Sequence, residues 1–133
     1  MKKIVLLLGM LVLVLTGCSS AKLSDAFDEE TVIASAKEAI DHLVKGECDK
    51  VVEKMSAEMQ EALTAEDLAA NMEAMDTLTG AFKEYKSSAV VGQQDAQGTD
   101  MAVAVIVAAF EKRNVTYTIS YNTDMEIVGL WMK

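Results

Sequence analysis

The stretch Met101–Tyr121, MAVAVIVAAFEKRNVTYTISY, decides the fold because it contains two strand patterns separated by a short turn. Residues 101–110 are apolar on both faces, which is typical of a strand in the middle of a sheet. After a polar turn at 112–114, residues 115–121 alternate between apolar and hydroxyl-bearing side chains with a period of two. The stretch therefore predicts two neighbouring antiparallel strands.

Two further strand patterns flank this pair. Residues 82–92 form a strand candidate that the turn cluster QQDAQGTD separates from the central strand, and residues 126–132 follow a turn at 122–124. Four consecutive strands with short turns favour a meander. One face of the central strand carries small side chains that permit close helix packing or leave room for a ligand, namely Ala102, Ala104 and Ala108.

The chain before Gly80 has helical periodicity. A first helix is predicted to begin at the acidic run 28–30 and to stop at Gly46, and a shorter segment at 51–63 is interrupted where Ser56 can cap a new turn. Thr64 to Asp67 resembles a capping box, and the following apolar stripe ends at Gly80. This stripe consists of Leu68, Met72, Met75 and Leu78.

Helices followed by strands predict an α+β domain, with the helices packed on one face of the sheet. Because antiparallel sheets twist, the helix-covered face is expected to be concave. We therefore expect a cone-like domain over residues 27–133, with about four strands in a curved antiparallel sheet.

The N-terminus is typical of a secretory signal. Lys2 and Lys3 precede an apolar run at 4–15, which is shorter than the roughly 20 residues that cross a bilayer. The sequence Leu15-Thr16-Gly17-Cys18 resembles the bacterial lipobox. That resemblance implies attachment of a diacylglycerol to the Cys18 sulfur and cleavage between Gly17 and Cys18, with residues 1–17 as the signal peptide and 18–26 as the lipidated tether.

The charge of the cleaved chain constrains its partners. Cleavage removes two of the 12 Lys and Arg residues and none of the 21 Asp and Glu residues, so the net charge of −9 becomes −11. This balance argues against nucleic-acid binding and against electrostatic attachment to anionic lipid. We expect the lipid on Cys18 to hold the protein at the extracytoplasmic face of the cell membrane.

Cys48 is the only thiol that remains after lipidation of Cys18, so no intrachain disulfide is expected. Its acidic neighbours disfavour the thiolate, and an inert, partly buried side chain is the preferred interpretation. The only histidine, His42, falls off the apolar stripe of its helix and is expected to face solvent. The combination of His42, Glu47, Cys48 and Asp49 lacks a recognised metal-ligand spacing, so we expect no metal site.

Features at the helix-to-sheet junction and in the last strand resemble a bacterial family of unknown function, often found in lipoproteins, within the nuclear-transport-factor-2-like superfamily. The resemblance rests on Gly80, Phe82 and Lys83 and on Ile127, Gly129 and Leu130, and it covers roughly residues 27–132. It implies a cone-shaped fold whose curved sheet wraps a long first helix. It supplies no catalytic residues for this chain.

The expected function is a non-catalytic, lipid-anchored domain that binds a partner protein or a small apolar ligand, with no cofactor apart from the covalent lipid. Four aromatic residues are candidates for a ligand-binding wall inside the cone: Tyr85, Tyr117, Tyr121 and Trp131. Two alternatives stay open. One is an enzyme of the isomerase or cyclase type that uses the cone interior, and the other is a structural homodimer formed through the sheet.

Overall fold

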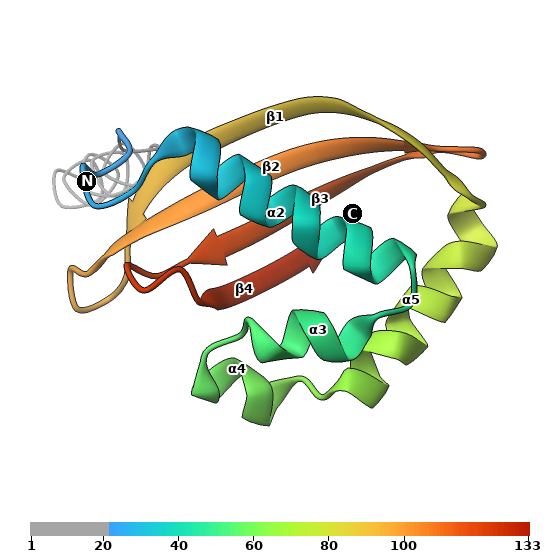
Figure 1. Ribbon diagram of the computed structural model, residues 1–133, viewed down its shortest axis with the longest axis horizontal. Coiled ribbons are helices and arrows are strands. Elements are labelled where there is room, and N and C mark those ends of the chain that lie inside the picture. The colour runs from blue at the N-terminus through green and yellow to red at the C-terminus, as the bar shows by residue number, and fades with distance from the viewer. Residues whose placement is uncertain (1–21) are drawn as a thin grey trace, which may run out of the picture.

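A computed structural model of the protein describes residues 22–133 and shows helices followed by strands (Figure 1). The predicted signal peptide, Gly17 and Cys18 lie outside these residues, as does the first part of the tether. The helices are α2 (Glu29–Val44), α3 (Cys48–Glu53), α4 (Ala57–Ala62) and α5 (Ala65–Thr79). The strands are β1 (Phe82–Gln94), β2 (Asp100–Phe110), β3 (Asn114–Tyr121) and β4 (Ile127–Met132). This order confirms the predicted α+β class.

The four strands pair in sequence order, and every pairing is antiparallel. The sheet is therefore the predicted meander, and it is open rather than closed into a barrel. As predicted, β2 occupies an interior position, since it pairs with β1 on one side and with β3 on the other.

Capping residues set the helix boundaries where the sequence predicts them. The Asp28 carboxylate accepts hydrogen bonds from the backbone N–H of Thr31 at 3.0 Å and from its hydroxyl at 2.7 Å. Thr64 and Asp67 form the predicted capping box at the start of α5, with hydrogen bonds of 3.2 and 3.3 Å. Each pair supplies acceptors for N–H groups that have no partner within the helix.

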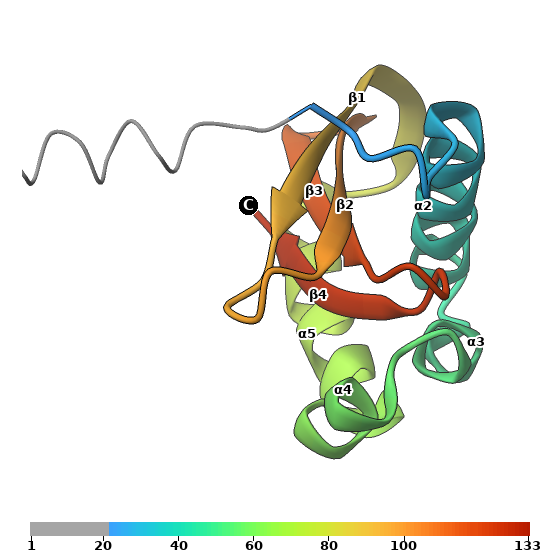
Figure 2. The ribbon, with the colours of Figure 1, turned by 90° about the vertical axis from the view of Figure 1, so that its left-hand side faces the viewer.

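Helix α2 packs across one face of the sheet, while α3, α4 and α5 form a second group of helices (Figures 1 and 2). The side chains of Ala36 and Ile40 on α2 and of Ala104 on β2 are completely buried. The small alanine side chains of β2 permit the close approach of the helix that the sequence allowed. The fully buried residues of this face of β2 are Ala102, Ala104, Ile106 and Ala108.

The chain enters the domain along the edge strand β1. A Cβ atom on Gly92 would overlap the backbone carbonyl of Lys22, so a residue with a side chain cannot fit there without a backbone shift. Just beyond this crossing, Phe27 joins the hydrophobic core. The crossing fixes the point at which any N-terminal tether meets the fold.

One residue of the apolar stripe predicted for the helix before Gly80 is not buried. Leu78 is 57% exposed, although it continues the spacing of Leu68 and Met72, which are buried. The reason is that α5 packs against α3 but leaves the core toward its C-terminal end, where Thr79 is buried instead. Periodicity identified the helix correctly but overestimated the length of its buried face.

Candidate functional site

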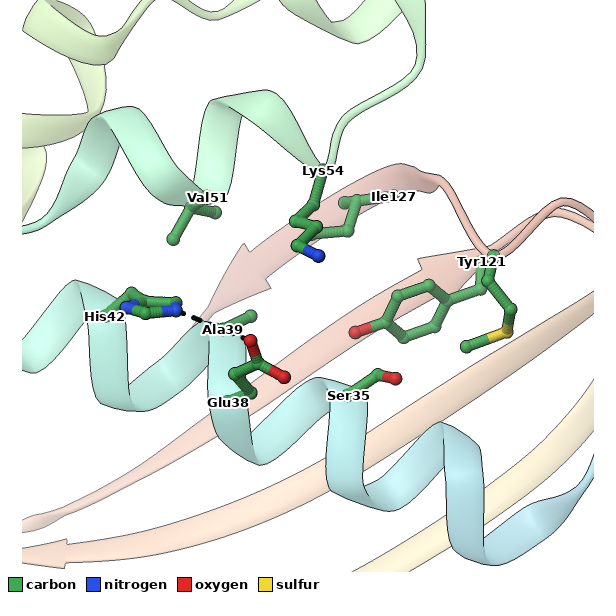
Figure 3. Close-up of a pocket in the computed structure, with 9 residues that line it drawn as sticks. Ser35, Glu38, Ala39, His42, Val51, Lys54, Tyr121 and Ile127 are labelled. Atoms are coloured by element: carbon green, nitrogen blue, oxygen red, sulfur yellow. Dashed lines mark ion pairs between the residues drawn. The ribbon is translucent and has the colours of Figure 1, made fainter.

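A pocket of about 150 Å³ lies beside helix α2, on the flank that faces α3 and the β3–β4 turn (Figure 3). It is smaller than the roughly 300 to 1,000 Å³ that is typical of sites for drug-sized ligands. Its walls combine charged, hydroxyl-bearing and apolar side chains from α2, from α3 and its C-cap, from β3, from the β3–β4 turn and from β4. They are Ser35, Glu38, Ala39, His42, Val51, Lys54, Tyr121, Met125 and Ile127.

A tight turn after α2 forms one end of the pocket. Gly46 has a φ angle of +78°, a conformation that glycine adopts at little cost. The turn lets the backbone N–H of Glu47 donate a 2.8 Å hydrogen bond to the carbonyl of His42. As a result, α3 folds back beside the C-terminal half of α2 and brings Val51 to the pocket wall.

The other end of α3 is joined to the start of β4 by two backbone hydrogen bonds. The N–H of Ile127 donates to the carbonyl of Lys54 at 2.8 Å, and the N–H of Ser56 donates to the carbonyl of Ile127 at 2.9 Å. Both Lys54 and Ile127 line the pocket. The backbone that carries this side of the pocket is therefore fixed by main-chain pairing rather than by side chains alone.

The β3–β4 turn contributes a residue with a strained backbone. Met125 has a φ angle of +60°, which non-glycine residues rarely adopt. The turn holds this conformation because the side-chain oxygen of Asn122 accepts hydrogen bonds from the N–H groups of Asp124 at 3.1 Å and Glu126 at 2.9 Å. Strained residues of this kind are concentrated at functional sites.

His42 is partly buried, which corrects the prediction that it simply faces solvent. Its side chain is 21% exposed, and its Nδ1 atom lies 3.1 Å from Oε1 of Glu47. Its Nε2 atom lies 3.6 Å from Oε1 of Glu38, one helical turn earlier on α2 (Figure 3). The helical stripe did not reveal this burial because the covering residues come from α3 and from the turn before it.

Glu47 connects the histidine to a cation. The Lys50 ammonium donates a 2.7 Å hydrogen bond to Oε2 of Glu47, while Oε1 faces His42. The hydrogen bond from Lys50 and then the contact with His42 lower the pKa of Glu47 to about 2. The negative charge of Glu47 thus holds one edge of the imidazole and leaves the other edge toward the pocket.

The most informative atom of the pocket is the hydroxyl oxygen of Tyr121. This oxygen is buried and has no hydrogen-bond partner among residues 22–133. The ring projects from the end of β3 into the pocket, with its hydroxyl toward Ser35 and Glu38 (Figure 3). Burial, and to a lesser extent the charge of Glu38, raises the pKa of Tyr121, so the hydroxyl keeps its proton. A buried hydroxyl without a partner costs free energy, and such groups are rare in folded proteins.

The other three predicted aromatic residues do not line this pocket. Tyr117 is a core residue that is 1% exposed, and Tyr85 directs its hydroxyl to α2, to the carbonyl of Lys37 at 3.0 Å and to Asp41 at 2.6 Å. Trp131 is 60% exposed and pairs in register with Thr118, on the sheet face opposite to Tyr117. The four residues therefore do not form one wall.

Cys48 is 4% exposed, in agreement with a buried structural side chain. Burial and the nearby charge of Asp49 raise the pKa of its thiol. Across residues 22–133, no group of three or more His, Cys, Asp and Glu side chains is arranged to hold a metal ion.

Four pocket residues of polar or flexible character were not predicted from the sequence: Ser35, Glu38, Lys54 and Met125. Ser35 and Glu38 recur at helical spacing with His42, so a search for polar residues along one flank of the first helix would have found them. Lys54 and Met125 carry no comparable signal, because their place in the pocket depends on the pairing of α3 with β4 and on the conformation of a turn.

The fold and this pocket define a class of protein: a small α+β domain with an open antiparallel meander and a polar side pocket. The chain belongs to the family described as "Protein of unknown function (DUF3887)", whose model matches residues 36–130. This match includes most of α2 and all of the pocket residues except Ser35. The likeness to the nuclear-transport-factor-2-like superfamily stays a prediction.

A solved structure supports the fold. The chain is similar to the "NMR structure of protein from Ruminococcus gnavus ATCC 29149", with 26% sequence identity and a TM-score of 0.72. The match covers 85% of this chain and 97% of that chain, so a protein with little more than this domain folds by itself. A comparison with curated proteins finds no significant match.

Proposed function

We propose that this chain is a lipid-anchored extracytoplasmic protein whose domain binds a small molecule in the pocket beside α2. The observation that carries the binding proposal is the buried hydroxyl of Tyr121, which has no hydrogen-bond partner among residues 22–133 and projects into the pocket. A ligand that accepts its hydrogen bond would remove the cost of that burial. Ligand pockets typically combine an apolar lining with a few polar groups of this kind.

The anchoring part of the proposal rests on the lipobox-like sequence that ends at Cys18. No helix within residues 22–133 is long and apolar enough to cross a membrane. The acidic charge of the chain gives it no electrostatic attraction to anionic lipid, so membrane attachment would depend on the acyl chains.

Binding is tested by NMR on ¹⁵N-labelled residues 22–133, with a library of molecules of up to about ten heavy atoms. A cavity of about 150 Å³ is known to hold benzene, so molecules of this size match the pocket. We expect shifts confined to the backbone amides of 35–42, 51–54 and 121–127, and a loss of these shifts in Tyr121→Phe. The control is Glu58→Gln on α4, which should retain them. Shifts clustered around Trp131 instead, or no shifts at all, would contradict the proposal.

Anchoring is tested in the full chain with a radiolabelled fatty acid in a bacterial host. Cys18→Ala should abolish both incorporation of the label and cleavage of the precursor. Cys48→Ala is the matched control and should leave both intact. Incorporation of label that persists in Cys18→Ala would show that the lipid is not attached there.

A second candidate is an enzyme that transfers protons, because His42 and Tyr121 line the same pocket and Glu47 orients the imidazole. In such an enzyme His42 would accept a proton next to a carbonyl group, and the Tyr121 hydroxyl would donate to the carbonyl oxygen. The test is deuterium exchange into cyclohexanone in D₂O. Exchange that is faster with the protein than in buffer, and that is lost in His42→Asn, would support catalysis. Equal exchange rates with wild type and with His42→Asn would exclude catalysis by His42 for this substrate class.

A further inference from the structure

The charges around the pocket suggest which molecules it accepts. Glu38 on α2 and Lys54 at the end of α3 both line the pocket, and they form no ion pair with each other. Within residues 22–133, the Lys54 ammonium has no carboxylate within 4.0 Å. A pocket whose walls carry one unpaired positive charge and one negative charge complements a ligand that carries both signs.

The hydroxyl of Tyr121 marks the position of the acceptor on the ligand. Because this hydroxyl keeps its proton, it offers a neutral donor, and donors form their strongest hydrogen bonds with charged acceptors such as carboxylates. In Figure 3 the Lys54 side chain extends toward the same part of the pocket as this hydroxyl. The two groups together suit a carboxylate.

Glu38 favours a positively charged group of the ligand, in contrast to Lys54. Its side chain is 61% exposed, and its only ion-pair contact within residues 22–133 is with His42, at 3.6 Å. One of its oxygens thus faces the histidine, and the carboxylate has further capacity to accept hydrogen bonds. An ammonium group on the ligand would find an acceptor here.

The remaining walls are apolar and set the size of the ligand. Ala39, Val51 and Ile127 are buried and Met125 is partly buried, and all four line the pocket. Space of about 150 Å³ next to these walls suits a short aliphatic group in addition to the two charged groups.

We propose that the pocket takes a small zwitterion of the α-amino acid type. Its carboxylate would lie between Lys54 and the Tyr121 hydroxyl, its ammonium would lie at Glu38, and a short aliphatic side chain would contact Val51 and Ile127. This inference rests on the proposed ligand-binding function of the pocket and names the chemical class of the ligand.

Three probes of similar shape separate the two charges. L-valine carries both, 3-methylbutanoate lacks the ammonium, and 2-methylpropylamine lacks the carboxylate. Each is titrated into ¹⁵N-labelled residues 22–133 and followed by NMR at the amides of 35–42 and 121–127. We expect L-valine to bind at least about tenfold more tightly than either analogue, since hydrogen bonds to charged groups are the stronger ones.

Variants assign each charge to one wall. Lys54→Gln should weaken binding of L-valine and 3-methylbutanoate by about tenfold and leave 2-methylpropylamine unchanged. Glu38→Gln should do the opposite, weakening L-valine and the amine only. Both side chains are exposed, so these variants should keep the fold, which the same NMR spectra verify. Lys83→Gln on β1 is the matched control and should change none of the three affinities.

The outcomes distinguish this inference from the proposed function. If 3-methylbutanoate binds as tightly as L-valine and Glu38→Gln changes nothing, the pocket recognises carboxylates alone and the zwitterion proposal is wrong. It is also wrong if none of the three probes binds while other library molecules shift the pocket amides. If neither the probes nor the library shift those amides, the Tyr121 hydroxyl holds only water and the proposed function fails as well.

Discussion

The two flanks of helix α2 each meet a tyrosine from the sheet, and they treat its hydroxyl in opposite ways. On the β1 flank, the Tyr85 hydroxyl donates to α2 at the carbonyl of Lys37 and the carboxylate of Asp41. On the β3 flank, the Tyr121 hydroxyl is buried and has no hydrogen-bond partner in the part of the chain that the structure describes, although hydroxyl, carboxylate and imidazole groups of α2 line the same pocket. The first flank is closed by its own hydrogen bonds, and the second leaves a hydrogen bond to be made.

The difference shows how one helix can serve stability and binding together. Aromatic packing also supports the closed flank, because the Tyr85 ring meets Phe82 edge to face at 5.0 Å and lies under the Lys37 ammonium at 5.1 Å. The open flank instead contains a strained turn residue, Met125, and a histidine between two carboxylates. The Tyr85 hydroxyl stabilises the fold because it is hydrogen-bonded within it. The Tyr121 hydroxyl has no such bond among residues 22–133, and it therefore indicates the pocket.

The largest effect is expected from Ile40→Ala, which removes a completely buried side chain between the two flanks. Loss of this packing should lower the free energy of unfolding by about 2 to 5 kcal/mol. Urea denaturation of residues 22–133 measures the change. Ile33→Ala on the same helix is the control, and it should cost less because Ile33 is only partly buried. Equal losses would mean that α2 does not rest on the sheet through Ile40.

Tyr85→Phe should have the next largest effect. The substitution keeps the ring and its aromatic contacts and removes only the hydroxyl, which donates to Asp41 at 2.6 Å. We expect a loss of about 1 to 2 kcal/mol in the free energy of unfolding, because the hydrogen bond to a carboxylate is lost and the carbonyl of Lys37 loses a donor. Asp41→Asn in the same denaturation experiment should cost less, since its amide oxygen can still accept. If Tyr85→Phe leaves the free energy of unfolding unchanged, the two flanks do not differ in the way described.

The sequence predicted the elements of both flanks but not the difference between them. The acidic start of the first helix at 28–30, the capping box at Thr64, the stop at Gly46 and the alternation in β3 depend on local chemistry, and the structure confirms them. The partial burial of His42, and the lack of a hydrogen-bond partner for the Tyr121 hydroxyl among the described residues, depend on which distant segments pack together. Sequence patterns placed Tyr85, Tyr117 and Tyr121 on the sheet as equivalent candidates, and only the tertiary contacts separate them.

Tyr121→Phe should not lower the free energy of unfolding, in contrast to Tyr85→Phe. Its hydroxyl has no hydrogen-bond partner to lose within residues 22–133, and removal of an unsatisfied buried polar group is neutral or favourable. The free energy of unfolding should stay the same or rise by up to about 1 kcal/mol. Urea denaturation of the two variants side by side measures the contrast. A loss in Tyr121→Phe as large as that in Tyr85→Phe would show that the hydroxyl stabilises the fold, and the argument for a ligand would fail.

The smallest effect concerns Glu47, which supports the open flank through His42. Its pKa is lowered from 4.5 to about 2, first by the hydrogen bond from Lys50 and second by the contact with His42. A carboxylate whose pKa is lower in the folded than in the unfolded state stabilises the fold at pH values above the unfolded-state pKa. This stabilisation is lost as the pH falls from about 4.5 to about 2. The free energies of unfolding of wild type and Glu47→Gln should therefore differ near neutral pH and converge across that interval. Because Glu47 is at the surface, the difference should be small and should shrink with added salt.

Glu58→Gln on α4 is the control, and its free energy of unfolding should change with pH in parallel with that of wild type. A gap between wild type and Glu47→Gln that stays constant down to pH 2 would show that the Glu47 charge does not stabilise the turn that carries His42.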